Sequence, residues 1–233
     1  MNIGLLQCDH VDAGFQHLLH DYDVAFRDLF KHHAPQINLT VYDACHGQLP
    51  DAVSACDGYI ISGSRHSAYD QLDWITQLAD FVRRVHQQQH KMVGICFGHQ
   101  VIAHALGGKV AKSANGWGVG VKPVDMQNTR AWMHPETPSY HLLLSHQDQV
   151  LTLPDGAEVL GGNAHCPVSM FAIADHLLGL QAHPEFTPQY AEALLSARLD
   201  RIGHEVAEAA RHTLQTPTDE AIITQWIAAF FAA

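Results

Sequence analysis

The stretch from Gly94 to Gln100, GICFGHQ, constrains the fold of this chain more than any other part of its sequence. Residues 91–96 (KMVGIC) form an apolar run of strand length, and the segment HQVIAHAL that soon follows has helical character and ends at two glycines. Only one tight turn separates the two elements. A strand that runs directly into a helix is typical of α/β proteins, in which helices connect parallel strands.

Apolar runs of strand length alternate with longer segments of helical periodicity over the N-terminal part of the chain. The strand-like runs are residues 2–8, 37–44, 57–63 and 91–96, and the segments of helical spacing are residues 21–34 and 68–89. The second of these helices carries an apolar stripe from Leu72 to Val85. This repeated order predicts a mostly parallel sheet that is covered by helices.

The pattern changes at Gly108. Between Gly108 and His183 the apolar runs are short and the turns are frequent, which predicts a mixed or antiparallel edge of the sheet. The remainder of the chain is helical again, with a break near Gly203. No linker-like tract divides the 233 residues, so we expect one domain over 1–233, with a C-terminal helical extension over about 203–233.

The balance of charges argues against a polyanionic partner. The chain has 13 lysines and arginines against 24 acidic residues, which gives a formal net charge of -11. Nucleic acids and anionic membranes bind clustered basic side chains, so we expect neither as a partner. The first residues lack the pattern of a secretory signal, and no window approaches the roughly 20 apolar residues that span a bilayer. We therefore expect a cytoplasmic protein that acts on a small molecule.

Cysteine and histidine are present in numbers that raise the question of a metal site. The five cysteines include no C-x-x-C pair, and the 19 histidines are scattered with no H-E-x-x-H pair. These spacings predict free thiols in a reducing compartment and no structural metal.

Cys96 lies at the centre of the G-x-C-x-G pattern between the strand and the helix. In such a nucleophile elbow, glycines two residues before and after the nucleophile remove the side chains that would collide at the turn. The following helix points its positive end at the sulfur, which lowers the pKa of a cysteine, and leaves the N–H of Phe97 free to donate. A buried cysteine between packing glycines is the alternative. The strand before and the helix after favour a nucleophile.

The segment QAHPEF supplies a candidate base for Cys96 at the end of the apolar run LLGLQA. Pro184 favours an extended conformation for His183, and side chains two apart on an extended segment face the same way. Glu185 can then orient the imidazole of His183 while His183 shares the proton of Cys96. Taken alone, a His-Pro-Glu sequence is more often a strand-end turn with a solvated acid.

Four motifs in order carry a resemblance to a known family over nearly the whole chain. They are ISGSRHSAYD (61–70), GICFGHQVIAHALGG (94–108), SHQDQV (145–150) and QAHPEF (181–186). In this order they resemble the class I (triad) glutamine amidotransferases, and most closely the stand-alone relatives of the GMP synthetase amidotransferase domain. The resemblance implies a flavodoxin-like, three-layer, mostly parallel sheet with helices on both faces and an antiparallel edge. Its site would lie at the carboxyl ends of the strands.

The resemblance also implies roles for individual residues. Cys96 would be the nucleophile, His183 the general base and acid, and Glu185 the acid that orients His183. Gly63 and Phe97 would supply the backbone N–H groups of the oxyanion hole.

Three further residues would hold the substrate by the same resemblance, namely Gln100, Ser145 and His146. The sequence departs from the common family pattern at the oxyanion strand, which often ends in Pro-Gly-Gly but here ends in Ser62-Gly63-Ser64. Gly63, the residue that would supply the backbone N–H, is present here, so the assignment of the oxyanion hole rests on it.

The resemblance implies an enzyme that hydrolyses the side-chain amide of glutamine through a cysteine thioester. Glutamate and ammonia would be the products, and neither half of the reaction requires a metal or an organic cofactor. The chain has no Walker-type phosphate loop, so a separate synthetase would have to accept the ammonia. Two alternatives stay open: a γ-glutamyl peptidase acting on glutathione-like peptides or conjugates, and a catalytically dormant subunit that binds glutamine or regulates a partner.

Overall fold

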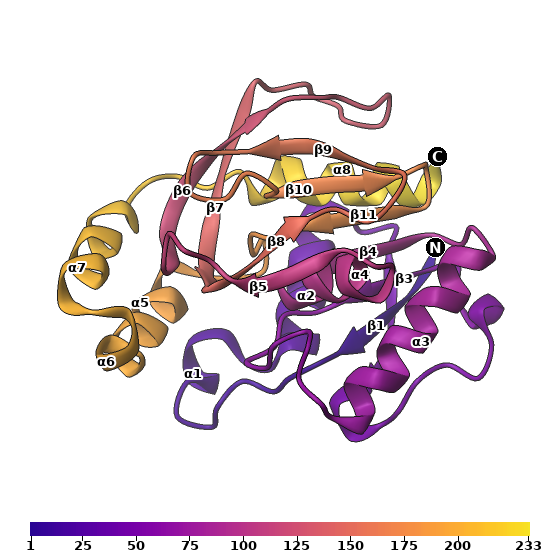
Figure 1. Cartoon of the computed structure of the whole chain (residues 1–233), viewed down its shortest axis with the longest axis horizontal. Helices are drawn as coiled ribbons and strands as arrows, with labels where there is room; N and C mark the ends of the chain where they lie inside the picture. The colour runs from indigo at the N-terminus through magenta and orange to yellow at the C-terminus, as the bar shows by residue number, and fades with distance from the viewer.

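The computed structural model describes all residues from 1 to 233 and has a nine-stranded sheet at its centre (Figure 1). The order of strands across this sheet is β2-β1-β3-β4-β11-β10-β9-β6-β7. Their bounds are β1 Asn2–Gln7, β2 Asn38–Asp43, β3 Gly58–Ile61, β4 Met92–Ile95, β6 Gly118–Met126, β7 Ser139–His146, β9 Ala157–Gly162, β10 Met170–Ile173 and β11 Leu177–Leu180.

The first five strands of that order are parallel, as the alternation of strands and helices predicted. β1 pairs with β2 and β3, and β4 pairs with β3 and β11, all in parallel. Ile95 pairs with Leu180 at the carboxyl ends of β4 and β11. The residues that follow these two strands therefore leave the sheet side by side, although they are far apart in the sequence.

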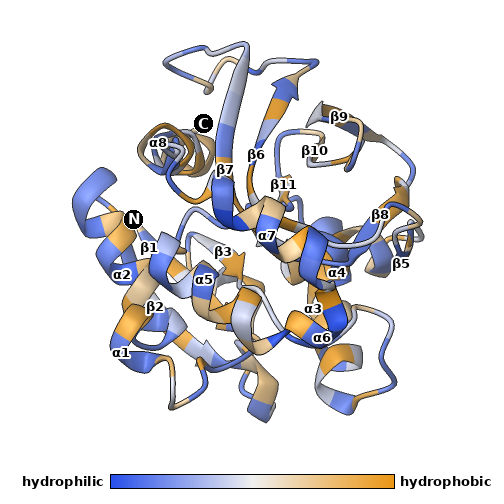
Figure 2. Ribbon diagram, turned by 90° about the vertical axis from the view of Figure 1, so that its left-hand side faces the viewer, coloured by the Kyte–Doolittle hydropathy of each residue, from blue (hydrophilic) through white to orange (hydrophobic).

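Helices cover both faces of the parallel strands (Figure 2). On one face α2 (Tyr22–His33) packs with α8 (Glu220–Ala232), and Phe26, Phe30 and Trp226 join the buried side chains of β1 and β4. On the other face α3 (Asp73–Gln87) and α4 (Phe97–Ala105) bury Leu78 and Val101. This three-layer arrangement confirms the predicted flavodoxin-like fold.

The remaining strands form the antiparallel edge that the short apolar runs predicted. β11, β10, β9, β6 and β7 are joined by antiparallel pairings, and β6 and β7 form a long hairpin. A separate antiparallel pair, β5 (Lys109–Lys112) and β8 (Asp148–Thr152), lies beside α4. The short elements are α1 Gln16–Leu19, η1 Ala44–His46 and η2 Val53–Ala55.

The helix predicted over residues 68–89 is shorter in the structure, because α3 begins only at Asp73. The preceding residues form a turn in which the N–H of Ser67 donates to the carboxylate of Asp70 and the N–H of Asp70 donates back to the carbonyl of Ser67. Such side-chain-to-backbone bonds compete with a helical start.

The C-terminal part contains α5 (Pro188–Ala197), α6 (Leu199–Ile202) and α7 (His204–Thr213) before α8. Gly203 has a φ of 89°, a value that favours glycine, and separates α6 from α7 at the predicted break. None of the helices is both long and apolar enough to cross a membrane.

Candidate active site

Cys96 occupies the tight turn between β4 and α4. Its φ of 52° and ψ of -100° are values that residues other than glycine rarely adopt. A Cβ atom on Gly94 would lie 2.4 Å from the backbone of Gly98, and a Cβ on Gly98 would lie 2.5 Å from the carbonyl oxygen of Ile61. Both separations are too short for real atoms. The two glycines are therefore required by the close approach of α4 to β3 and β4.

His183 and Glu185 lie past the end of β11, beside the turn that carries Cys96. The backbone N–H of His183 donates to the carbonyl of Leu143 at 2.9 Å, which fixes the position of His183 against β7. Its Nδ1 lies 2.7 Å from Oε1 of Glu185, and Phe186 stacks on the imidazole with 3.8 Å between ring centroids. Both His183 and Glu185 are buried. Glu185 engages Nδ1, so Nε2 is the ring nitrogen left for Cys96.

The two backbone groups predicted for the oxyanion hole lie next to these side chains. Gly63 follows β3, and a Cβ atom there would lie 2.8 Å from Cε1 of His183. The hydroxyl of Ser62 accepts from the N–H of Cys8 at 2.9 Å and so ties this segment to the end of β1. Phe97 is the first residue of α4, where N–H groups have no partner within the helix.

The electrostatics around His183 favour a positive imidazole. Burial alone would lower the pKa of His183, but the negative charges of Glu185 and of a Cys96 thiolate, with hydrogen bonds to both groups, raise that pKa above its ordinary value. An imidazolium stabilises an adjacent thiolate, and the positive end of α4 adds to this effect. The raised pKa therefore keeps His183 protonated at neutral pH, next to Cys96.

The three residues predicted to hold the substrate all line one cleft above Cys96, but each also has a bond within the protein. The amide of Gln100 donates to the carbonyl of Asp148 at 2.8 Å, and the hydroxyl of Ser145 accepts from Arg198 at 2.8 Å. His146 is buried, and burial lowers its pKa to about 3, so its imidazole is neutral. Its Nδ1 lies 3.1 Å from the same carbonyl of Asp148, while Nε2 has no partner in the protein.

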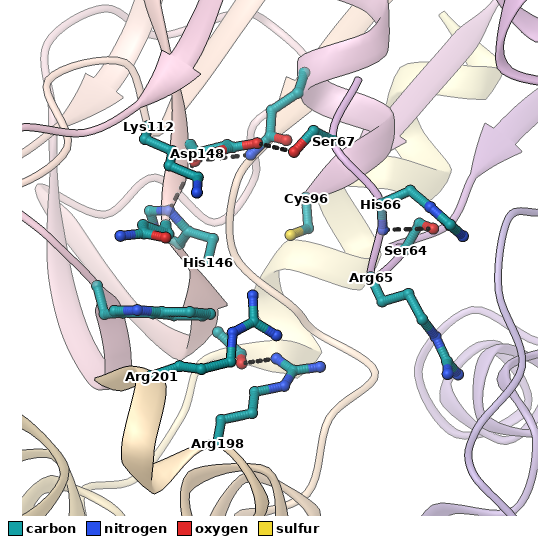
Figure 3. Close-up of a pocket in the computed structure, with 14 residues that line it drawn as sticks. Ser64, Arg65, His66, Ser67, Cys96, Lys112, His146, Asp148, Arg198 and Arg201 are labelled. Carbon is teal, nitrogen blue, oxygen red and sulfur yellow. Dashed lines mark hydrogen bonds between the residues drawn. The ribbon is translucent and has the colours of Figure 1, made fainter. Parts of the chain in front are cut away.

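The cleft is open to solvent and has strongly positive walls (Figure 3). Arg65, Lys112, Arg198 and Arg201 line it together with one carboxylate, Asp148. Three of these cations, Lys112, Arg198 and Arg201, form no ion pair within the protein. Since the whole chain carries a formal charge of -11, this concentration of positive charge contrasts with the rest of the protein and favours anions in the cleft.

Comparison with known proteins identifies the family. A family model described as glutamine amidotransferase class-I matches residues 12–201. The chain belongs to the class I glutamine amidotransferases. The solved structure of a glutamine amidotransferase from Thermotoga maritima superposes on this family member with a TM-score of 0.75 and 18% identity, covering 99% of this chain and 96% of that one. At this level of identity the superposition supports the shared fold.

Two curated relatives of this class I amidotransferase are named for different activities. "Gamma-glutamyl peptidase 3" of Arabidopsis thaliana is 33% identical over 189 residues, which cover 77% of this chain and 76% of the relative. "GMP synthase [glutamine-hydrolyzing]" of Neisseria meningitidis serogroup B is 35% identical over 133 residues, which cover 56% of this chain and 24% of the synthase. The similarity to the peptidase thus extends over most of both chains.

The sequence alone did not single out several residues of this amidotransferase site. Gln181 is fully buried, and its amide donates to Sγ of Cys96 at 3.5 Å and accepts from Gln100 at 3.1 Å. One signal was available, because Gln181 lies two residues before His183 in an extended segment. Arg198 and Arg201 carried no such signal, because only the folded helices α5 and α6 bring them to the cleft.

Proposed function

We propose that this chain hydrolyses γ-glutamyl amide bonds through a thioester on Cys96. The observation that carries the proposal is the buried arrangement of Cys96, His183 and Glu185 at a strained turn. The turn between β4 and α4 fixes the position of Cys96, whereas the carboxylate of Glu185 and the ring of Phe186 fix the orientation of His183. Orientation of this kind is what nucleophilic catalysis by cysteine requires.

The proposed reaction has two halves. The Cys96 thiolate attacks the γ-carbonyl carbon, and the N–H groups of Gly63 and Phe97 stabilise the oxyanion of the tetrahedral intermediate. His183 then donates its proton to the departing nitrogen, the carbon–nitrogen bond breaks, and a γ-glutamyl thioester remains. In the second half His183 accepts a proton from water, whose oxygen attacks the thioester. Glutamate leaves and the Cys96–His183 ion pair is restored.

The charge of the cleft supports a γ-glutamyl peptide as the preferred substrate. Free glutamine carries one carboxylate, whereas a γ-glutamyl peptide carries a second carboxylate on the group that leaves. Lys112, Arg198 and Arg201 have no acidic partner of their own in the protein, and guanidinium groups bind carboxylates in a bidentate manner. The similarity to "Gamma-glutamyl peptidase 3" over most of both chains supports the same substrate class.

Glutamine is the second candidate, supported by the class I amidotransferase family to which the chain belongs. Cys96, His183 and Glu185 would carry out the same steps, with ammonia as the leaving group and a separate synthetase as its acceptor. In that case the isolated chain would be slow or dormant until the synthetase binds.

Parallel assays of purified protein with a glutathione-like γ-glutamyl peptide and with glutamine test the proposal. We expect release of the dipeptide with a higher kcat/KM than release of ammonia, and loss of both activities in Cys96→Ala. A higher kcat/KM for glutamine would favour the amidotransferase reading. No turnover of either substrate, with or without lysate fractions that contain synthetases, would overturn both readings.

A further inference from the structure

Four potential metal ligands converge at the carboxyl ends of β1 and β2, apart from the residues that surround Cys96. They are His10, which follows β1, and Asp43, Cys45 and His46, which lie at the end of β2 and in η1. One ligating atom from each residue lies within 4.8 Å of those from the other three. The parallel pairing of Gln7 with Asp43 brings these two segments together.

We propose that His10, Asp43, Cys45 and His46 form a binding site for a zinc ion. Two imidazoles, one thiolate and one carboxylate are donors that zinc takes in tetrahedral sites. Two negative donors, Asp43 and the thiolate of Cys45, neutralise the two positive charges of the ion. Harder ions such as magnesium and calcium favour sites made of oxygen alone.

The distances between the donor atoms agree with a tetrahedral site. Donors about 2.0–2.3 Å from a central zinc lie roughly 3.3–3.8 Å from one another. Nε2 of His10 lies 3.3 Å from Oδ1 of Asp43, Sγ of Cys45 lies 3.2 Å from the same oxygen, and Nδ1 of His46 lies 3.7 Å from Sγ of Cys45. Nδ1 of His46 is closer than this range to both oxygens of Asp43, at 3.0 Å from Oδ1 and 2.9 Å from Oδ2. Small side-chain adjustments accommodate the ion.

A second carboxylate positions His10 for this role. Nδ1 of His10 lies 2.6 Å from Oδ2 of Asp21, which favours an N–H at Nδ1 and leaves Nε2, 3.3 Å from Oδ1 of Asp43, as the nitrogen that would ligate the ion. Histidines that ligate metals commonly donate their other ring nitrogen to a carboxylate in this way. Asp21 is itself fixed, because Oδ1 accepts from the N–H groups of Val11 and Tyr22.

Binding requires only the loss and relocation of protons. The thiol of Cys45 now donates to Asp43, and on binding it would release its proton to solvent as the sulfur–zinc bond forms. The proton of His46 would move from Nδ1 to Nε2. The side chain of His46 is 65% exposed, so the ion can enter from solvent and the displaced proton can leave.

The site is separate from the chemistry proposed at Cys96. It joins the ends of β1 and β2, and none of its four residues lines the cleft. Arg65 of the cleft donates to the carbonyl of His10 at 2.8 Å, and His10 also lines a neighbouring pocket with Arg198 and Arg201. We therefore expect zinc to stabilise the fold by binding the native state and not to enter the reaction.

Cobalt spectroscopy of untagged, chelator-treated protein tests the proposal. The parent is Cys96→Ser, because a thiolate beside His183 could bind metal at the candidate active site. We expect one cobalt ion per chain, with a thiolate-to-cobalt absorption band, displacement by one equivalent of zinc, and a higher Tm with zinc. Cys45→Ser in this parent should abolish the band, and His46→Ala should weaken zinc binding by at least about tenfold.

Two further variants separate a metal site from a hydrogen-bonded cluster. Asp21→Asn keeps an N-cap for α2 but presents an amide N–H to Nδ1 of His10, which forces the proton onto Nε2, so we expect zinc affinity to fall about 10–100-fold. His141→Ala is the matched control, because His141 lies 3.6 Å from Asp219 without a thiol nearby, and it should change nothing. A band that survives Cys45→Ser, or unchanged zinc affinity in both His46→Ala and Asp21→Asn, would overturn the proposal.

Discussion

The two walls of the candidate active site are built in opposite ways. Around Cys96 the positions are fixed by backbone and close packing: a strained turn, glycines that admit no side chain, and a buried pair of His183 and Glu185. The opposite wall presents Lys112 and Arg201, which have no acidic partner in the protein. We infer that the first wall determines which bond is broken and that the second selects the molecule that contains it.

The largest effect should come from removing the nucleophile. Cys96→Ala cannot form the thioester, so we expect turnover of every γ-glutamyl substrate to fall by at least about 10³-fold. Circular dichroism should show an unchanged fold, since an alanine leaves the packing of the turn intact. Cys45→Ser is the control and should keep its activity. Substantial turnover by Cys96→Ala would refute the assignment of the nucleophile.

Replacement of the orienting acid should be the next most severe change. In Glu185→Gln the negative charge that raises the pKa of His183 is lost, so we expect kcat to fall roughly 10²–10⁴-fold. A group with a raised pKa stays protonated until the pH exceeds that pKa, so activity should fall on the alkaline side. Loss of the charge should move this alkaline limb to lower pH. A pH profile of kcat/KM with the limb unmoved would contradict the proposed role.

Gly63 provides a steric test of the same wall. The Cβ atom of Gly63→Ala would lie 2.8 Å from His183, and a displaced imidazole should lower kcat about 10²-fold. Gly14→Ala is the matched control, because no atom lies within 4 Å of its added Cβ. An equal kcat for the two variants would contradict the claim that catalysis depends on the exact position of His183.

The smallest effect should come from the cationic wall, and it should fall on KM. Arg201→Gln and Lys112→Gln remove partly solvated charges, so we expect KM for a γ-glutamyl peptide to rise about threefold to tenfold with little change in kcat. KM for glutamine should change less, since glutamine lacks the second carboxylate. Arg27→Gln is the control, because Arg27 on α2 does not line the cleft. Equal changes for both substrates would remove the argument for a peptide substrate.

The same contrast explains what the sequence could predict. The alternation of strands and helices and the G-x-C-x-G turn are local sequence patterns. They predicted the parallel sheet, the antiparallel edge and the tight turn at Cys96. The motif QAHPEF placed His183 and Glu185 within one short segment, so their pairing was also accessible.

Features that depend on folding of distant segments were not accessible. Lys112 and Arg201 line the same cleft only because the fold brings β5 and α6 to it. The cluster of His10 with Cys45 was missed for the same reason, because its spacing matches no linear metal motif and the pairing of β1 with β2 creates it. A sequence pattern identifies side chains held by their own segment, whereas side chains brought together across the fold require the structure.

The most direct test of the central claim is mass spectrometry of the intact protein after reaction with an electrophilic glutamine analogue, such as a chloroketone, followed by peptide mapping. Cys45 is the only one of the five thiols that is not buried, so it is the natural competitor of Cys96 for the reagent. The account predicts one adduct, located on Cys96, whose formation is slowed by a γ-glutamyl peptide. An unlabelled Cys96 that still reacts with an ordinary thiol reagent, or equal labelling of Cys45, would contradict it.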